Sequence, residues 1–554
     1  MDLTPLQRPW RRYLARALTP SATHLRSVDG KRLRRPYAIA TAPPASSAAP
    51  SDPTLEIYDV VVLGGGPAGL SLLSALRSSP RTAHLRCALI EAQDLGKTAN
   101  WSPPSATFSN RVSSLTPKSV AFLKKIGAWQ HVQRKRVQAY GEMQVWDGVS
   151  GSRIEFDWPE EGRANSSSQQ AGSTSSPPQP EDALERWLDE GDESPNQEPP
   201  HPGAQDNPHT VAYMTENANL TRALVSRLTS LGGVTIQSPV RLESITFGSS
   251  TDDIDLSQWP LLTLDSGERL LSRLLVGADG FNSPVRSFAC IDSHGWDYEQ
   301  HGVVATVRLE GQGWGGEDWK TAYQRFLPTG PIALLPLPGN LSTLVWSTTP
   351  SHAALLKSVP PEHFTALVNA GFRLSPADLA YLFNIMPSSQ LLSADFADEV
   401  AWRLPHAPVQ DPRKIPQSIL SVQPDSVASF PLRLRHASHY TTSRIALVGD
   451  AAHTMHPLAG QGLNMGQGDV EALVKVIEAG VQVGADIGSS ILLEDYEAAR
   501  YAGNDRMLGV VDKLNKLYRT EFGPIVGLRS MGLDMVNRMG PVKRFFMSQA
   551  AGLS

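Results

Sequence analysis

Short apolar runs and polar turns alternate along the chain, and their spacing changes from region to region. Residues 60–63 form a continuous apolar run rich in β-branched side chains, which predicts a buried strand. After a glycine-rich turn, leucines recur at helical spacing at positions 70, 73 and 76. A second helical face is predicted for Leu220, Leu224, Leu228 and Leu231, with Gly232 and Gly233 ending the helix. Strand, turn and helix in this order predict an α/β fold.

A different pattern occupies residues 301–349, where apolar residues recur at every second position, as at Val303, Ala305, Val307 and Leu309. This spacing predicts an antiparallel sheet, which could form one wall of a substrate site. A hairpin turn is predicted at residues 265–267, before a buried strand at 274–277.

The turn between the first strand and helix has the G-x-G-x-x-G spacing of a dinucleotide-binding loop. It comprises Gly64, Gly66 and Gly69, with Pro67 and Ala68 at the start of the helix. The first glycine makes the turn, the second lets the backbone approach a pyrophosphate, and the third lets the helix pack on the strand. Glu91 ends the next predicted strand, 22 residues after Gly69, where it could accept a hydrogen bond from a ribose hydroxyl. The loop alone does not identify the dinucleotide.

Two later strands also end in small and acidic residues. Asp279 and Gly280 follow the strand at 274–277, and Gly449 and Asp450 follow a strand at 445–448. The second pair leads to a helix start formed by Gly460, Gln461, Gly462, Leu463 and Asn464. Asp450 would be free to accept from sugar-like hydroxyls, and the helix N-terminus would stabilise negative charge in front of it.

Arg111 comes shortly before a predicted helix start, with Thr116 as the cap and Pro117 as the first helical residue. Composition alone leaves two roles open for this arginine, which could bind a phosphate or pair with a surface acid.

No catalytic residue can be named from the sequence. His453 and His456 could be general bases, but a structural role is favoured because no paired carboxylate is visible. The two cysteines, Cys87 and Cys290, cannot build a disulfide framework or a cysteine zinc site, and no metal site is predicted. The 554 residues carry a net charge of −5, and this charge does not indicate a nucleic-acid-binding protein.

Two regions differ in composition from the rest. Residues 1–50 are rich in arginine and poor in acids, with an amphipathic start, which predicts a mitochondrial transit peptide and linker rather than a basic arm. Residues 159–209 are acidic, polar and proline-rich, and we expect a disordered surface insertion.

The three ordered motifs resemble those of the group A flavoprotein aromatic hydroxylases, which have the p-hydroxybenzoate hydroxylase fold. This resemblance implies an FAD cofactor, with its ADP half on the first motif and Asp450 on its ribityl chain. It associates Asp279 and Gly280 with both FAD and pyridine nucleotide, and Arg111 with FAD.

Residues 110–117, 430–432, 457–464 and 529–533 are similar to one branch of that family, the mitochondrial ring hydroxylases of ubiquinone (coenzyme Q) biosynthesis. The branch implies hydroxylation of a polyprenylated phenol by O₂ through a C4a-hydroperoxyflavin. It also implies electrons from a ferredoxin and its reductase, membership of a multi-subunit ubiquinone-biosynthesis complex, and a place on the matrix side of the inner membrane. Only one credible dinucleotide loop occurs, which leaves none for NADPH, although related hydroxylases bind NADPH without one.

Residues 524–546 mix apolar and basic side chains, among them Arg529, Leu533 and Arg538. The segment could contact the membrane surface peripherally or pack in a core, and composition does not decide between them.

We therefore expect an FAD-binding Rossmann-like domain interleaved with an antiparallel-sheet substrate domain, plus C-terminal helices. The expected boundaries are 55–158, 210–290 and 441–510 for the FAD-binding parts, 291–440 for the substrate domain and 511–554 for the helices. The alternatives are a hydroxylase of another phenol, or a non-enzymatic prenyl-binding protein of the Rab GDP-dissociation inhibitor type.

Overall fold

The computed structural model describes residues 55–104, 106–156, 210–250, 254–311, 320–385, 393–407, 411–457 and 460–539. The predicted transit peptide (1–50) and acidic insertion (159–209) lie outside these residues, so both stay predictions. The same holds for the last part of the C-terminal segment, from residue 540 onward.

The first sheet has eight strands and is built on the buried run predicted at residues 60–63. Its main path is β17 (Thr441–Thr442), β18 (Ile445–Leu447), β10 (Arg269–Gly277), β1 (Leu55–Leu63), β2 (Cys87–Ile90) and β7 (Val234–Gln237). From β18 to β7 all neighbours are parallel. The remaining strands are β9 (Pro260–Leu264), antiparallel to β10, and β8 (Leu242–Phe247), antiparallel to β9. The β9–β10 pairing confirms the hairpin predicted at residues 265–267.

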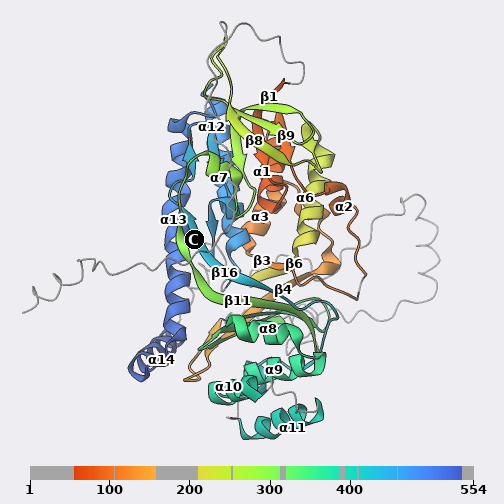
Figure 1. The fold of residues 1–554 in the computed structure, drawn as a ribbon, viewed down its shortest axis with the longest axis vertical. Helices are drawn as coiled ribbons and strands as arrows, with labels where there is room; N and C mark the ends of the chain where they lie inside the picture. Colours follow the sequence, from red (N-terminus) through yellow and green to blue (C-terminus); the bar gives the residue numbers. More distant parts are fainter. Residues whose placement is uncertain are drawn as a thin grey trace, which may run out of the picture. The chain divides into compact units, whose positions relative to one another are not determined.

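Helices pack against this sheet (Figure 1). They are α1 (Pro67–Ser78), α6 (Asn217–Leu231) and α12 (Gly462–Gln482), with shorter α2 (Leu95–Ala99), α3 (Pro117–Lys125) and α7 (Pro284–Phe288). Gly232 ends α6 with φ 62°, as predicted, because a left-handed residue closes the helix without steric cost. Thr116 caps α3 by accepting a hydrogen bond from the Ser119 amide, and Pro117 is its first residue, also as predicted.

The second sheet has eleven strands and is antiparallel except where β12 runs parallel to β4. Its main path is β19 (His453–Thr454), β16 (Ala428–Ala437), β11 (Ser293–Leu309), β14 (Leu341–Thr348), β13 (Gly330–Pro336), β12 (Lys320–Leu327), β4 (Val137–Asp147), β6 (Ala212–Glu216) and β3 (Val112–Leu115). The side strands are β15 (Ile419–Val422) on β11 and β5 (Arg153–Phe156) on β4. The antiparallel pairings of β11, β13 and β14 confirm the pattern predicted for residues 301–349.

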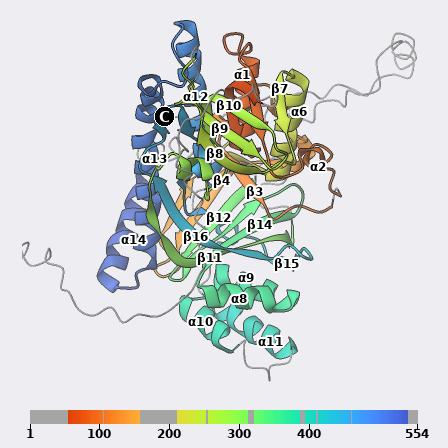
Figure 2. The same ribbon diagram turned by 45° about the horizontal axis from the view of Figure 1, so that its top comes forward.

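One face of this sheet is covered by helices α8 (Pro350–Ser358), α9 (Pro361–Arg373), α10 (Pro376–Ile385) and α11 (Ser393–Arg403) (Figure 2). Ile332 and Trp346 are fully buried on this face, in one core with the apolar residues of α9. The other face carries a smaller core that includes Phe108, Tyr140 and Leu341.

The described chain ends in two helices, α13 (Ser490–Arg519) and α14 (Gly523–Arg538). Helix α14 is held against the second sheet by a buried ion pair between Arg529 Nε and Asp147 Oδ2, 2.8 Å apart, and by buried Leu533. Arg529 and Leu533 belong to the segment 524–546, which from its composition could contact the membrane or pack in a core. For these two residues core packing is the alternative that holds, because they form the inner face of the helix.

Among the described residues no helix is long and apolar enough to cross a membrane. The expected fold class is confirmed, since a helix-flanked parallel sheet is interleaved with an antiparallel sheet and followed by C-terminal helices.

Candidate functional site

The glycine turn (residues 64–69) joins β1 to α1, and glycine occupies its three positions for different physical reasons. Gly64 has φ 110°, and a Cβ there would lie 2.2 Å from the Ala278 carbonyl oxygen. A Cβ at Gly69 would lie 2.0 Å from the Gly64 carbonyl oxygen. Gly66 has an ordinary φ of −74°, and a Cβ there would meet nothing within 4 Å. The fold therefore requires two of the glycines, while the third leaves open space at the N-terminus of α1, where an anion is favoured.

Glu91 follows β2 and lies against the glycine turn. Its Oε2 accepts from the Gly65 amide at 2.5 Å, and its Oε1 accepts from the Gln93 amide at 2.6 Å. The carboxylate is half-buried. Because each oxygen has a further lone pair, the carboxylate can still accept from a ligand hydroxyl.

The Asp279 turn (residues 278–280) follows β10 beside the glycine turn, where the Ala278 amide donates to the Leu63 carbonyl at 2.8 Å. Asp279 Oδ2 accepts from the Val285 amide at 3.2 Å, at the start of α7. Its Oδ1 is buried without a hydrogen-bond partner among the described residues, and burial raises the pKa of this carboxyl. Gly280, at φ 82°, borders open space.

The Asp450 turn (residues 449–452) follows β18, the next strand of the same sheet. Gly449 has φ 60°, and a Cβ there would lie 3.4 Å from the Cβ of Ala68, one residue after Pro67 in α1. Asp450 is exposed, although the surrounding protein displaces enough water to raise the pKa of its carboxyl. Arg286 Nη1 donates to the Ala451 carbonyl at 2.6 Å, so the Asp279 and Asp450 turns are linked.

The predicted helix start at residues 460–464 is the beginning of α12, which opens at Gly462 with Gln461 as the preceding residue. Leu463 packs against the main core, whereas a Cβ at Gly462 would meet nothing within 4 Å. Asn464 Nδ2 donates to the Ser114 carbonyl at 2.7 Å, and its Oδ1 accepts from the Thr116 amide at 3.0 Å. Gly460, at φ 57°, lies close to Ser114, so β3 and the start of α12 form one unit.

Arg111 directly precedes β3, and its side chain is exposed. Its carbonyl accepts from the Asn217 amide at 3.0 Å, which fixes the backbone at the start of the strand. No described acid forms an ion pair with its guanidinium, so the surface-pair reading gains no support.

The loop before Arg111 is held by residues that the sequence analysis missed. Arg136 Nη2 and the Ser109 amide both donate to Glu216 Oε1, at 2.8 and 2.6 Å, and Arg136 lies over the Phe108 ring. Gln423 bonds both the amide and the carbonyl of Phe108 at 2.9 Å. No local pattern marks these residues, because their partners are far away in the sequence.

The structure corrects the expectation for His453. His453 does have a carboxylate partner, since its Nε2 lies 2.6 Å from Asp469 Oδ2 and both side chains are fully buried. The pair is not evident from the sequence because Asp469 is on α12, 16 residues later. His456 is also fully buried, and burial lowers its pKa to about 4.

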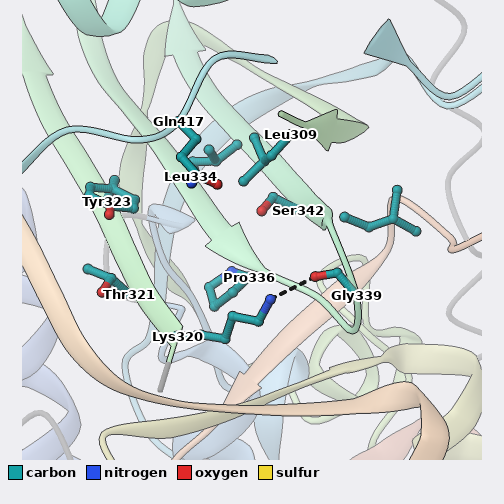
Figure 3. Close-up of a pocket in the computed structure, with 10 residues that line it drawn as sticks. Leu309, Lys320, Thr321, Tyr323, Leu334, Pro336, Gly339, Ser342 and Gln417 are labelled. Atoms are coloured by element: carbon teal, nitrogen blue, oxygen red, sulfur yellow. Dashed lines mark hydrogen bonds between the residues drawn. The ribbon is translucent and has the colours of Figure 1, made fainter. Parts of the chain in front are cut away.

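The structure also contains a small enclosed space that is separate from these turns (Figure 3). It lies among Leu309, Tyr323, Leu334, Gly339 and Lys320, whose Nζ donates to the Gly339 carbonyl at 2.7 Å. Its volume of about 20 Å³ suits a single water molecule. None of the predicted site residues lines it. Within the described part of the chain, no cluster of His, Cys, Asp and Glu is arranged to hold a metal ion.

Comparisons with known proteins agree with this arrangement. A family model described as "FAD binding domain" matches residues 57–364 and 402–509. The "Ubiquinone biosynthesis monooxygenase COQ6, mitochondrial" of Saccharomyces cerevisiae is 37% identical over 520 residues, covering 92% of this chain and 95% of that protein. The human protein of the same name is 35% identical over 505 residues, covering 90% and 93%. A crystal structure of p-nitrophenol 4-monooxygenase from Pseudomonas putida has a TM-score of 0.55 at 18% identity, with 89% and 98% covered, which shows the fold alone.

The residues present fit a flavin dinucleotide. The open space at Gly66 is where a pyrophosphate could approach the N-terminus of α1. Asp450 is accessible, and the buried Asp279 Oδ1 has no partner among the described residues. All three turns follow neighbouring strands of one parallel sheet, the edge at which such folds bind nucleotides.

Proposed function

The chain belongs to the COQ6 family of ubiquinone biosynthesis monooxygenases, and from this premise we propose that it uses FAD and O₂ to hydroxylate the ring of a polyprenylated phenolic precursor of ubiquinone. The observation that carries the proposal is the convergence of the three motif turns at one edge of the parallel sheet, beside the antiparallel sheet.

Each turn has a proposed role in holding the cofactor. The glycine turn and the N-terminus of α1 bind the pyrophosphate, Glu91 binds the ribose, and Asp450 binds the ribityl chain. The Asp279 turn borders the same space. The N-terminus of α12, at residues 460–464, supplies partial positive charge for the reduced ring. FAD, when bound, supplies the activation of O₂.

The antiparallel sheet offers a face for the substrate. Along β13, Ile332 and Leu334 are buried under the helices, whereas Ala333 and Leu335 on the opposite face are only half-buried. Ala333 pairs in register with Val345, which is also half-buried. An accessible apolar patch in the middle strands of a sheet suits an aromatic ring with a polyprenyl tail. We therefore place the substrate on this face, where the protein would orient the ring and exclude water.

The direct test is flavin content and ring hydroxylation. We expect purified protein to be yellow and to add oxygen to a polyprenylated phenol when its flavin is reduced. Lipids from cells that lack the protein should contain the unhydroxylated intermediate. A colourless protein that binds prenyl chains would instead favour the prenyl-binding alternative. Turnover of simple phenols without prenylated ones would favour another hydroxylase.

The electron donor is proposed to be a ferredoxin with its reductase. Support comes from the single credible dinucleotide loop, which FAD would occupy, and from the family. Anaerobic stopped-flow measurement of flavin bleaching, with substrate present, should show slow reduction by NADPH alone and fast reduction by a ferredoxin system. Rapid, complete bleaching by NADPH alone would assign the nicotinamide to the Asp279 turn instead.

The location is proposed to be the matrix side of the mitochondrial inner membrane, within a ubiquinone-biosynthesis complex. The arginine-rich residues 1–50 support import, and a matrix-peptidase site is predicted after Tyr37. Mass spectrometry of protein from isolated mitochondria should find residues up to about 40 removed. An intact Met1 would contradict this prediction.

Peripheral membrane contact is proposed for the outer face of α14. Leu528 and Met531 are each 71% exposed, and Met535 is exposed on the same face, while Arg529 anchors the opposite face. An exposed apolar helical face suits insertion at a membrane surface, and a polyprenylated substrate resides in the bilayer.

Flotation with liposomes that contain anionic lipid tests this contact. The double variant Leu528→Glu and Met531→Glu should lose flotation, because two charges would enter the apolar layer. The matched control adds the same charges to exposed positions of α8, as Ala354→Glu and Ser358→Glu, and should still float. Equal flotation of both variants would exclude α14 as the contact.

A further inference from the structure

We propose that Asp469, on α12, is a positioning residue of the cofactor site. It holds the Asp450 turn in the conformation in which Asp450 can bind the ribityl chain. The inference rests on the proposed FAD function and assigns a role to a residue outside the three motifs.

Asp469 is a fully buried carboxylate with four hydrogen-bond donors around it. Oδ2 accepts from the Gly449 amide at 3.1 Å and from His453 Nε2 at 2.6 Å. Oδ1 accepts from Arg500 Nε at 2.9 Å and from Asn504 Nδ2 at 3.0 Å. An ionised carboxylate has about four lone-pair sites, so its acceptor capacity is filled.

The charge of Asp469 is maintained by these partners. Burial alone would raise the pKa of its carboxyl, but His453 and Arg500 together lower it. A carboxylate can only accept, so His453 carries a hydrogen on Nε2. Its Nδ1 is buried with no hydrogen-bond partner among the described residues. The contact with Asp469 thus fixes the orientation of the imidazole ring.

The hydrogen bonds behind Asp469 anchor it rather than conduct protons. Asn504 Nδ2 also donates to the Tyr440 hydroxyl at 3.1 Å, and that hydroxyl lies 2.9 Å from His436 Nε2. The Asn504 amide group donates in both directions and cannot accept a proton from Tyr440. The network therefore supports the carboxylate from the side away from the turn.

The Asp450 turn is consequently held from two sides by charged groups. Asp469 binds the amide of Gly449, the residue before Asp450, and Arg286 binds the carbonyl of Ala451, the residue after it. Gly449 has the left-handed conformation at φ 60°, and glycine has many other conformations open to it. The hydrogen bond from its amide to Asp469 therefore fixes the conformation of the turn. The direction in which Asp450 points depends on this pair of contacts.

A double-mutant cycle on FAD affinity tests the inference, with binding to apoprotein followed by quenching of flavin fluorescence. Asp469→Asn places an NH₂ group among four donors, and we expect FAD to bind about 10- to 100-fold more weakly. Asp450→Ala should cause a loss of similar size. If Asp469 acts through Asp450, the double variant should bind FAD within about threefold of the weaker single variant. Additive losses, in which the double variant's loss of affinity is about the product of the two single losses (about 100- to 10,000-fold), would overturn the inference.

Asn504→Ala separates positioning from general stability. It removes one bond to Asp469 on the side away from the turn, so it should lower the unfolding temperature while FAD affinity stays within about threefold. If this variant loses FAD affinity as severely as Asp469→Asn, the inference is wrong. Should Asp469→Asn prove insoluble, the same cycle with Asp469→Glu applies, because that variant keeps the charge and displaces the oxygens. Additive losses there would overturn the inference equally.

The outcome also distinguishes this inference from the proposed function. A wild-type protein that binds no FAD would overturn both. A wild-type protein that binds FAD while the two substitutions act additively would overturn only the role of Asp469.

Discussion

The glycine turn and the Asp450 turn lie at the same edge of one sheet, yet they are stabilised in different ways. The glycine turn is determined by residues within six positions of one another and by the backbone of Ala278, just after β10, since a Cβ at Gly64 or Gly69 would overlap backbone oxygens. The Asp450 turn is held by side chains far away in the sequence, Asp469 on α12 and Arg286 on α7.

This difference determines how each turn should respond to perturbation. Steric constraints on backbone atoms are insensitive to charge, so the glycine turn should respond to side-chain volume and little else. Buried charged groups respond to the loss of a partner and to protonation. The two turns can therefore be separated experimentally, one by adding carbon atoms and the other by changing charge.

The largest effect is expected from a Cβ at Gly69. Gly69→Val would place a Cβ 2.0 Å from the Gly64 carbonyl oxygen, and we expect a loss of about 3 kcal/mol or more in the free energy of unfolding, or no soluble protein. Urea denaturation of the apoprotein measures this. Gly66→Val is the matched control, because its Cβ meets nothing within 4 Å. Equal stability of the two variants would contradict the steric account.

The second largest effect is expected to be loss of FAD from a protein that still folds. Gly66→Val fills the space for the pyrophosphate, and Asp450→Ala removes the ribityl acceptor. We expect both proteins to be folded but colourless or weakly coloured, with FAD bound about a hundredfold more weakly. Absorbance at the flavin band after gel filtration, compared with protein concentration, is the measurement. Stoichiometric FAD in both variants would show that the cofactor is placed wrongly.

The same contrast explains what the sequence could predict. The strand–turn–helix unit around residue 64, the cap at Thr116 and the end of α6 at Gly232 each depend on neighbours a few residues away, and all three are confirmed. The partner of His453 could not be found, because Asp469 lies on a different element and no spacing rule links them. The Arg136–Glu216 pair and the place of β4 in the antiparallel sheet were missed for the same reason. The cofactor roles of the motif residues stay predictions.

Acidification should destabilise the region after the Asp450 turn through His456. In the unfolded chain this histidine takes up a proton below about pH 6.5, whereas in the folded protein burial lowers its pKa to about 4. The unfolded state thus binds more protons between these values, so stability is full above about pH 6.5 and falls as the pH is lowered. At pH 5 the loss attributable to this one group is about 2 kcal/mol.

Urea midpoints of the apoprotein at pH 7 and pH 5 test the contribution of His456 to this pH dependence, with the His456→Gln variant as the comparison. The variant should lose less stability between the two values than the wild type. His436, whose pKa burial also lowers, contributes in the same direction in both proteins and so cancels. An unchanged pH dependence in the variant would show that His456 is not the group responsible. The Gly69→Val variant, where it folds, should keep the wild-type pH dependence, since it changes no charge.

The smallest effect concerns two helix caps that share one local motif in different surroundings. Thr116 caps α3 and Thr349 caps α8, each followed by proline and each accepting from the amide three residues later at 3.3 Å. Thr116 is also linked to the start of α12, because Asn464 Oδ1 accepts from its amide at 3.0 Å and lies 3.4 Å from its hydroxyl oxygen, and alanine would remove the second contact. Replacing either threonine by alanine should cost about 1 kcal/mol of stability, the usual value of a cap, and serine should restore most of it.

Only Thr116→Ala should also weaken FAD binding, by a few-fold, because it loosens α3 where β3 meets the start of α12. A parallel series of unfolding curves and FAD titrations on the two alanine variants decides the matter. Equal FAD affinity in both would mean that the local cap and the distant tie act independently, and that the beginning of α12 is positioned by Asn464 and the backbone alone.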